Sequence, residues 1–151
     1  MNRLEFQLKD KMRMFDELEE NCPPGYTGMI ELFTDLEHKT VDRYYARAYF
    51  KDGIFHNTKD EAFYQNYKDQ QAYWYIIEGK SYGMCLFNYF EVICREEDEQ
   101  EIGLIDGCHY INRKDVISIK KGKHGLNWIK FKVDGSIKKL PMFKFLVKIL
   151  D

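Results

Sequence analysis

The feature that most constrains the fold is a series of short apolar runs in the second half of the chain. Glycine-containing or charged turns separate the runs, and Asp134-Gly135 between alternating apolar residues is a strong hairpin signal. Sequential short strands joined by tight turns predict an antiparallel meander. The runs are rich in Ile, Val, Phe, Tyr and Trp and cover residues 72–78, 82–95, 102–111, 116–120, 126–133 and 137–140.

Two further signals lie between residues 43 and 70. Over 44–50, small or aromatic residues alternate with arginine and tyrosine, and this period of two predicts a strand with one buried and one wetter face. The segment Thr58-Lys59-Asp60-Glu61 matches a helix capping box. It predicts a second helix from Thr58 to about Gln70.

Residues 1–21 have the spacing of an amphipathic helix. Prolines at the end of this segment, in Asn21-Cys22-Pro23-Pro24-Gly25, are expected to terminate it, because proline has no N–H to donate. We expect the apolar stripe to pack on the chain's own sheet, and a homodimer formed through this helix is the alternative. The stripe consists of Leu4, Leu8, Met12, Phe15 and Leu18.

These signals predict one α+β domain over residues 1–151. Its parts are an N-terminal amphipathic helix (1–21), a mixed segment with a second helix (26–71) and a β-rich part (72–151). We expect the sheet to be curved, antiparallel and barrel-like. The tail at 141–150 is expected to close it as a short helix, although its apolar pattern also fits a strand.

The strand rhythm from Tyr110-Ile111 through Asp115–Lys121 resembles the later strands of pleckstrin-homology-like bacterial domains. The resemblance covers about half of the chain and departs from that family in the short final helix. It implies a bent barrel that binds proteins or anionic headgroups rather than a catalyst.

The charge distribution divides the chain after Ile111. Residues 1–111 hold 12 basic and 22 acidic residues, a net charge of −10, whereas residues 112–151 hold 11 basic and 3 acidic residues, a net charge of +8. A split of this size creates a strong local potential even though the total is −2, and it favours a charged partner.

The basic segment supplies the candidate binding residues. Alternation along 126–133 places Ile129 and Phe131 on one face and Trp128 on the other, and if the isoleucine face is the core, the indole is exposed between lysines. Lysines with an exposed ring suit an acidic protein surface or single-stranded nucleic acid. Alternatively, these lysines only solubilise the surface and face the acidic half of the molecule. The candidate residues are Lys120, Lys121, Lys123, His124, Trp128, Lys130 and Lys132.

Two His-x-Thr triplets, at 38–40 and 56–58, have an enzymatic interpretation. They resemble the paired motifs of two-histidine phosphoesterases, in which His38 and His56 would relay protons. The short spacing between them argues against this interpretation, and Thr58 already serves the predicted capping box. A phosphoesterase is therefore kept only as an alternative.

Other reactive residues have simpler structural interpretations. The cysteines, at positions 22, 85, 94 and 108, lack a C-x-x-C pair, so we expect reduced, buried thiols rather than disulfides or a metal site. The acidic run Glu96–Glu101 lacks the glycine turn of a cation site and fits a solvated hairpin tip. No cofactor motif occurs, so no cofactor is expected.

We therefore expect a binding protein rather than an enzyme, although no motif decides the point. A small inhibitor, as immunity and phage counter-defence proteins are, fits the size and charge of the chain. The expected partner is another protein with an acidic surface, and a nucleic-acid-binding module is the alternative. No run reaches the length of a membrane span and no export signal begins the chain, so a cytoplasmic location is expected.

Overall fold

The computed structural model describes residues 2–39, 41, 43–68, 70–87, 92–93 and 109–151. The described residues form one short α-helix, three 3₁₀ turns and thirteen strands. In chain order the elements are β1 (Arg3–Gln7), η1 (Lys11–Arg13), α1 (Met14–Glu20), β2 (Gly28–Phe33), β3 (Tyr44–Lys51), β4 (Ile54–Phe55), β5 (Phe63–Tyr67), β6 (Gln70–Ile77), β7 (Lys80–Phe87), β8 (Val92–Ile93), β9 (His109–Asn112), η2 (Arg113–Asp115), β10 (Val116–Lys121), η3 (Lys123–Gly125), β11 (Asn127–Val133), β12 (Ser136–Pro141) and β13 (Val147–Leu150).

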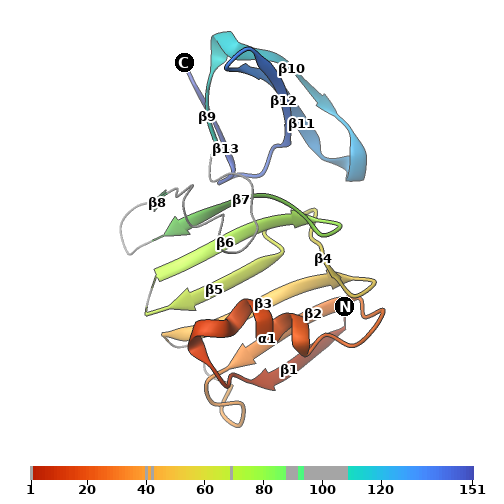
Figure 1. The fold of residues 1–151 in the computed structure, drawn as a ribbon, viewed down its shortest axis with the longest axis vertical. Helices are drawn as coiled ribbons and strands as arrows, with labels where there is room; N and C mark the ends of the chain where they lie inside the picture. The colour runs from red at the N-terminus through yellow and green to blue at the C-terminus, as the bar shows by residue number, and fades with distance from the viewer. Residues whose placement is uncertain (1, 40, 42, 69, 88–91, 94–108) are drawn as a thin grey trace.

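The strands form two parts that stack along the long axis of the molecule (Figure 1). The first part is an eight-stranded sheet with the order β1-β2-β3-β5-β6-β7-β8, and β4 pairs with β3. The second part contains the sheet β10-β11-β12 and the pair β13-β9. All pairs are antiparallel except β1–β2 and β13–β9. The predicted α+β class with a mostly antiparallel sheet is confirmed, but no sheet in the described residues closes into a barrel.

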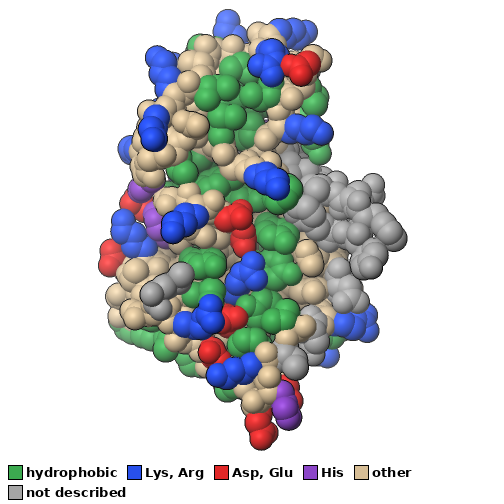
Figure 2. All heavy atoms as spheres, turned by 180° about the vertical axis from the view of Figure 1, so that it is seen from behind, with side chains coloured by type: hydrophobic (Ala, Val, Ile, Leu, Met, Phe, Trp, Pro, Cys, Tyr) green, Lys and Arg blue, Asp and Glu red, His purple; other side chains and the backbone are tan. Residues whose placement is uncertain are grey.

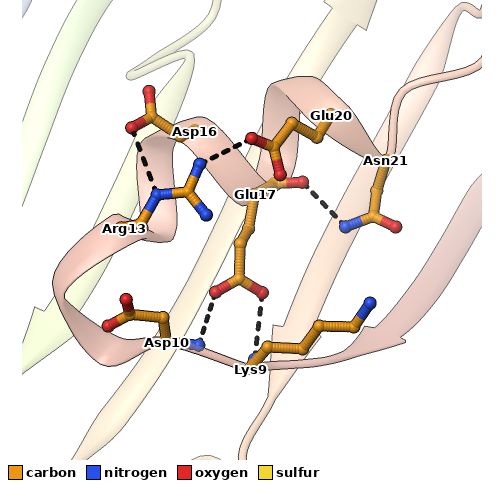
Figure 3. Close-up of polar contacts among 7 residues, drawn as sticks. All are labelled: Lys9, Asp10, Arg13, Asp16, Glu17, Glu20 and Asn21. Atoms are coloured by element: carbon orange, nitrogen blue, oxygen red, sulfur yellow. Dashed lines mark hydrogen bonds and ion pairs between the residues drawn. The ribbon is translucent and has the colours of Figure 1, made fainter.

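The predicted helix over residues 1–21 is wrong for its first half. Residues Arg3–Gln7 form an edge strand because they pair in parallel with β2, with Leu4 opposite Ile30. The helix α1 begins only at Met14. A buried carboxylate holds the corner between strand and helix, since Glu17 accepts hydrogen bonds from the N–H groups of Lys9 (2.9 Å) and Asp10 (2.6 Å) (Figure 3).

The predicted second helix is also wrong, because an Asx turn replaces the capping box. The Asn57 side chain accepts from the Lys59 N–H (3.0 Å) and donates to the Glu61 carbonyl (2.8 Å). A side chain that satisfies nearby backbone groups in this way competes with helix formation. The chain then continues as strand β5, where aromatic residues pack on both faces of the sheet.

The predicted C-terminal helix is replaced by a strand. Residues Val147–Leu150 pair in parallel with β9, with Ile149 opposite Ile111. The β-branched residues of this segment favour an extended backbone, and a compact turn at 143–147 precedes it. Without a closed barrel or a C-terminal helix in the described residues, the resemblance to pleckstrin-homology-like domains is not confirmed.

The hairpin turn predicted at Asp134-Gly135 is confirmed, and two further turns share its geometry. Both central residues have positive φ at Asp52-Gly53 (52° and 80°), Glu78-Gly79 (49° and 79°) and Asp134-Gly135 (49° and 77°). This conformation is that of a type I′ turn, whose twist matches that of the flanking strands. The two-residue turn at Asp134-Gly135 fixes the register of β11 on β12.

The helix α1 covers one face of the first sheet. Met14 and Leu18 are 1% and 0% exposed and pack in one cluster with Ile30, Ala46 and Ala48. The strand predicted over 44–50 is confirmed and both alanines lie on its buried face, but the predicted wetter face is wrong at Tyr45, which is only 3% exposed. The apolar residues of α1 therefore pack on the chain's own sheet, which is the first of the two predicted arrangements.

A second cluster joins the two stacked parts. Tyr75 and Ile77 of β6 pack against Phe143 and Leu146, and the rings of Tyr75 and Phe143 stack at 5.1 Å. The cluster therefore connects the first sheet to the segment that leads into β13. We call this cluster the junction core.

The cysteines of the chain are only partly within the described residues. Cys22 is an unpaired thiol and Cys85 is disulfide-bonded, so the prediction of reduced thiols is wrong for Cys85. Cys94, Cys108 and the run Glu96–Glu101 lie outside the described residues. No helix of the described part is long and apolar enough to cross a membrane.

The junction core predicts that the two parts unfold together. Leu146 is fully buried, so Leu146→Ala should lower the free energy of unfolding by roughly 2–5 kcal/mol while leaving a single transition in urea. The control is Leu150→Ala at a site that is 38% exposed, which should cost much less. Two separate transitions in the wild type would contradict a shared core.

A buried carboxyl predicts a specific pH dependence of stability. Burial, reinforced by Asp60, raises the pKa of Glu61 from 4.5 to about 7, although Arg47 lies 3.0 Å away and opposes the shift. The folded state then holds this proton more tightly than the unfolded state. The free energy of unfolding should therefore fall as the pH rises from about 4.5 to about 7, by at most about 3 kcal/mol.

Urea unfolding at pH 5 and pH 8 measures this effect. Glu61→Gln should remove this part of the pH dependence, and Glu37→Gln at an exposed site serves as the control. An unchanged pH profile in Glu61→Gln would contradict the assignment.

Candidate functional site

The sheet β10–β12 has one apolar face and one basic face. Ile129 and Phe131 are 0% and 4% exposed and pack with Leu140 in the core of the second part. The predicted alternation of β11 is therefore confirmed for the inner face. The outer face carries Trp128 and the alternate lysines.

Four lysines lie on the outer face, and we call this surface the lysine face. It consists of Lys120 on β10, Lys130 and Lys132 on β11 and Lys139 on β12, all exposed. The register places Lys130 directly opposite Lys139, and Lys120 opposite Trp128. Residues that face each other across an antiparallel pair point to the same side of the sheet, so the four side chains share one surface.

The charges of the lysine face are not neutralised within the described part of the chain. None of its four lysines forms an ion pair with a described carboxylate. In Figure 2, basic side chains predominate over the part that holds β9–β13, whereas acidic and basic side chains mix over the first sheet. Like charges directly opposite each other destabilise a sheet, so the pair Lys130–Lys139 favours an external anion.

The predicted exposed indole is wrong, because Trp128 is only 9% exposed. Its ring packs edge-on against Tyr82 of β7 at 5.8 Å, and its Nε1–H donates to the Lys123 carbonyl at 3.1 Å. The turn passes so close that a Cβ on Gly122 would lie 2.8 Å from the indole Cδ1. Trp128 therefore cannot serve as a protruding anchor for a partner.

A cavity of about 250 Å³ lies where β7 meets the second part. Its lining consists of Lys80, Tyr82, Lys123, Trp128 and Lys139. The Lys80 Nζ lies 5.2 Å from the centre of the Tyr82 ring, and the Lys139 Nζ lies 5.8 Å from that of Trp128. Cation–π contacts thus hold two ammonium groups against the aromatic walls. We call this site the junction cavity.

The remaining predicted site residues occupy different positions. Lys121 lies opposite Asn127 at the end of β10, on the face away from Lys120. Lys123 lines the junction cavity. His124 contacts the ring of His56 at 5.5 Å and lies 3.9 Å from Glu78, so it contacts the first part instead of the lysine face.

The histidine beside His124 is held in a structural contact. His56 Nδ1 accepts a hydrogen bond from the Glu78 N–H at 2.9 Å. Burial, together with the nearby Lys51 ammonium and His124 ring, lowers the pKa of His56. The neutral ring is the form that can accept this hydrogen bond.

The structure does not bring the two histidines of the phosphoesterase alternative together. His38 follows β2 and pairs with Asp35, near the end of β3 at which Tyr45 lies opposite Phe33. His56 donates its N–H to the Tyr49 carbonyl near the other end of β3. His56 and Thr58 line a cavity of about 360 Å³ whose lining does not include His38.

Sequence reasoning did not place three of the cavity residues in the candidate site. Lys139 could have been added, because the two-residue turn at Asp134-Gly135 dictates that it lies opposite Lys130. Lys80 and Tyr82 could not, because tertiary packing of the first sheet against the second part brings β7 beside Trp128.

No protein-family model, curated protein or solved structure matches this chain. Its function has to be inferred from its own geometry. Among the described residues, no three His, Cys, Asp or Glu side chains are grouped to hold a metal ion.

The close contact of the turn with Trp128 predicts that Gly122→Ala displaces the indole. The added Cβ, 2.8 Å from Cδ1, should cost about 1–3 kcal/mol and red-shift the Trp128 emission, measured in a Trp74→Phe background. The control is Gly135→Ala, whose Cβ meets no atom within 4 Å, so that only its positive φ adds strain. Unchanged Trp128 emission in Gly122→Ala would contradict the observed packing.

Proposed function

We propose that the protein is a non-catalytic nucleic-acid-binding protein that contacts the phosphate backbone through the lysine face. The observation that carries the proposal is the set of four exposed lysines on one side of β10–β12 without a carboxylate partner in the described residues. Lysines neutralise phosphates and release condensed counterions, which gives affinity without reading the base sequence.

The spacing of the lysine face suits a repeating anion. Neighbouring strands lie about 4.8 Å apart, and alternate residues on one strand are separated by about 6.7 Å. Lys130 and Lys132 are alternate residues of β11, and Lys139 lies across from Lys130. Long, flexible lysine side chains can follow phosphates at such spacings.

The burial of Trp128 favours a nucleic acid over an acidic protein. Protein interfaces concentrate aromatic and arginine anchors and contain few lysines, whereas the lysine face has no arginine and its one aromatic ring is buried. Binding of single strands requires exposed rings on which bases can stack. A duplex, which presents closely spaced phosphates, is therefore the preferred partner.

Charge reversal of the lysine face tests the proposal. The triple variant Lys120→Glu, Lys130→Glu, Lys132→Glu should weaken binding to a duplex uniformly across sequences. It should also flatten the slope of log K against log salt concentration by about three, about one for each lost contact. Fluorescence anisotropy with labelled duplexes of unrelated sequence measures both quantities.

A matched variant and a competing ligand make the test specific. Lys114→Glu, Lys144→Glu, Lys148→Glu changes the net charge of the same segment equally but leaves the lysine face intact, so it should retain most of the affinity. Equal losses of duplex affinity in both variants would show that the net charge of the segment, and not the lysine face, determines binding. Tighter binding to polyglutamate than to the duplex would assign an acidic protein as the partner instead.

A further inference from the structure

The junction cavity differs from the lysine face in its chemistry. It gathers three lysines, at positions 80, 123 and 139, around two aromatic rings, and no carboxylate lines it. The Nζ atoms of Lys80 and Lys139 lie at its aromatic walls, and a bound anion would offset these positive charges. The cavity is built from three separate elements, β7, η3 with its flanking turn, and the hairpin β11–β12.

The contacts within the cavity indicate which part of a ligand it can take. Lys80 and Lys139 lie over the rings of Tyr82 and Trp128, so a ligand meets ammonium groups before it meets the ring faces. The indole N–H already donates to the Lys123 carbonyl. The cavity therefore offers a ligand the charged N–H donors of its lysines. It does not offer a free ring face on which a nucleobase could stack.

We propose that the junction cavity binds a phosphate monoester. Such a group carries close to two negative charges at pH 7 and three strong acceptor oxygens, and lysines bind phosphate as point charges. The volume of about 250 Å³ equals that of about eight water molecules, which leaves room for the phosphate and part of its ester. The cation–π contacts restrict Lys80 and Lys139 in advance, which lowers the entropic cost of binding.

Two sources can supply this chemistry. One is a free ester such as a mononucleotide, and the other is the terminal phosphate of a duplex bound on the lysine face. Lys139 belongs to both sites, so a strand end on the lysine face lies next to the cavity. Only the second source rests on the proposed function.

Titration with small ligands at constant ionic strength tests the cavity by itself. Adenosine 5′-phosphate should raise the melting temperature saturably and change the Trp128 emission in a Trp74→Phe background, whereas adenosine should do neither. Lys80→Gln, Lys123→Gln should weaken the phosphate ester about tenfold or more. The control Lys130→Gln, Lys132→Gln should bind it like the wild type, since neither residue lines the cavity.

The proposal is overturned if adenosine 5′-phosphate gives no saturable shift up to millimolar concentration, or if Lys80→Gln, Lys123→Gln binds it as the wild type does. Equal binding of adenosine would also overturn it, because the phosphate would then be irrelevant.

Duplexes with and without a 5′-phosphate distinguish the sources. If the phosphorylated duplex binds more tightly, and the double variant Lys80→Gln, Lys123→Gln loses this gain, the ligand of the cavity is the terminal phosphate of a strand. Binding of the mononucleotide with no gain from a terminal phosphate assigns the free ester. Binding of the mononucleotide without any duplex binding supports the cavity while refuting the proposed function of the lysine face.

Discussion

The junction cavity, beside the lysine face, depends on the packing of the junction core. Tyr75 and Ile77 of the first sheet are fixed against Phe143 and Leu146, and this contact holds the hairpin β6–β7 beside the second part. Tyr82 of that hairpin can then cover Trp128. If this apolar contact were absent, the indole would be exposed and the junction cavity would lose one wall. Apolar packing in the junction core thus positions the charged groups of the junction cavity.

The lysine face differs from the first part of the molecule in how its charges are paired. In the first part, several basic side chains pair with carboxylates, and Arg47 also lies over the Tyr64 ring at 4.3 Å. In the second part the lysine face has no such partners among the described residues. Among the described residues, the lysine face therefore shows no neutralisation by the acidic half, and the run Glu96–Glu101 lies outside them. The pairs of the first part include Arg3–Glu31 (3.3 Å), Lys39–Glu5 (2.9 Å) and Arg47–Glu61 (3.0 Å).

Local signals predicted the strands and hairpins well and the helices poorly. The alternation at 44–50 and the turn at Asp134-Gly135 correctly predicted strands, because a period of two and a pair of positive φ angles are local properties. The helical spacing of residues 1–21 was overridden when β1 paired with β2. The capping box did not form, because the side chain of Asn57, just upstream of it, accepts a hydrogen bond from the Lys59 N–H instead. Long-range pairing and competing side-chain hydrogen bonds are not visible in a local pattern.

The contrast between local patterns and long-range contacts also explains the result for the candidate site. The sequence predicted which basic residues share a face, but it did not predict how other elements cover that face. Strand alternation was sufficient to place Lys130 and Lys132 on one face, and turn geometry adds Lys139. Alternation also places Trp128 on that face, but a face of a strand is exposed only if no other element covers it. Here a hairpin more than 40 residues earlier in the chain and the Gly122 turn cover the ring. Burial of the indole removes an anchor for a protein partner and, by the same contacts, creates a lysine-lined cavity.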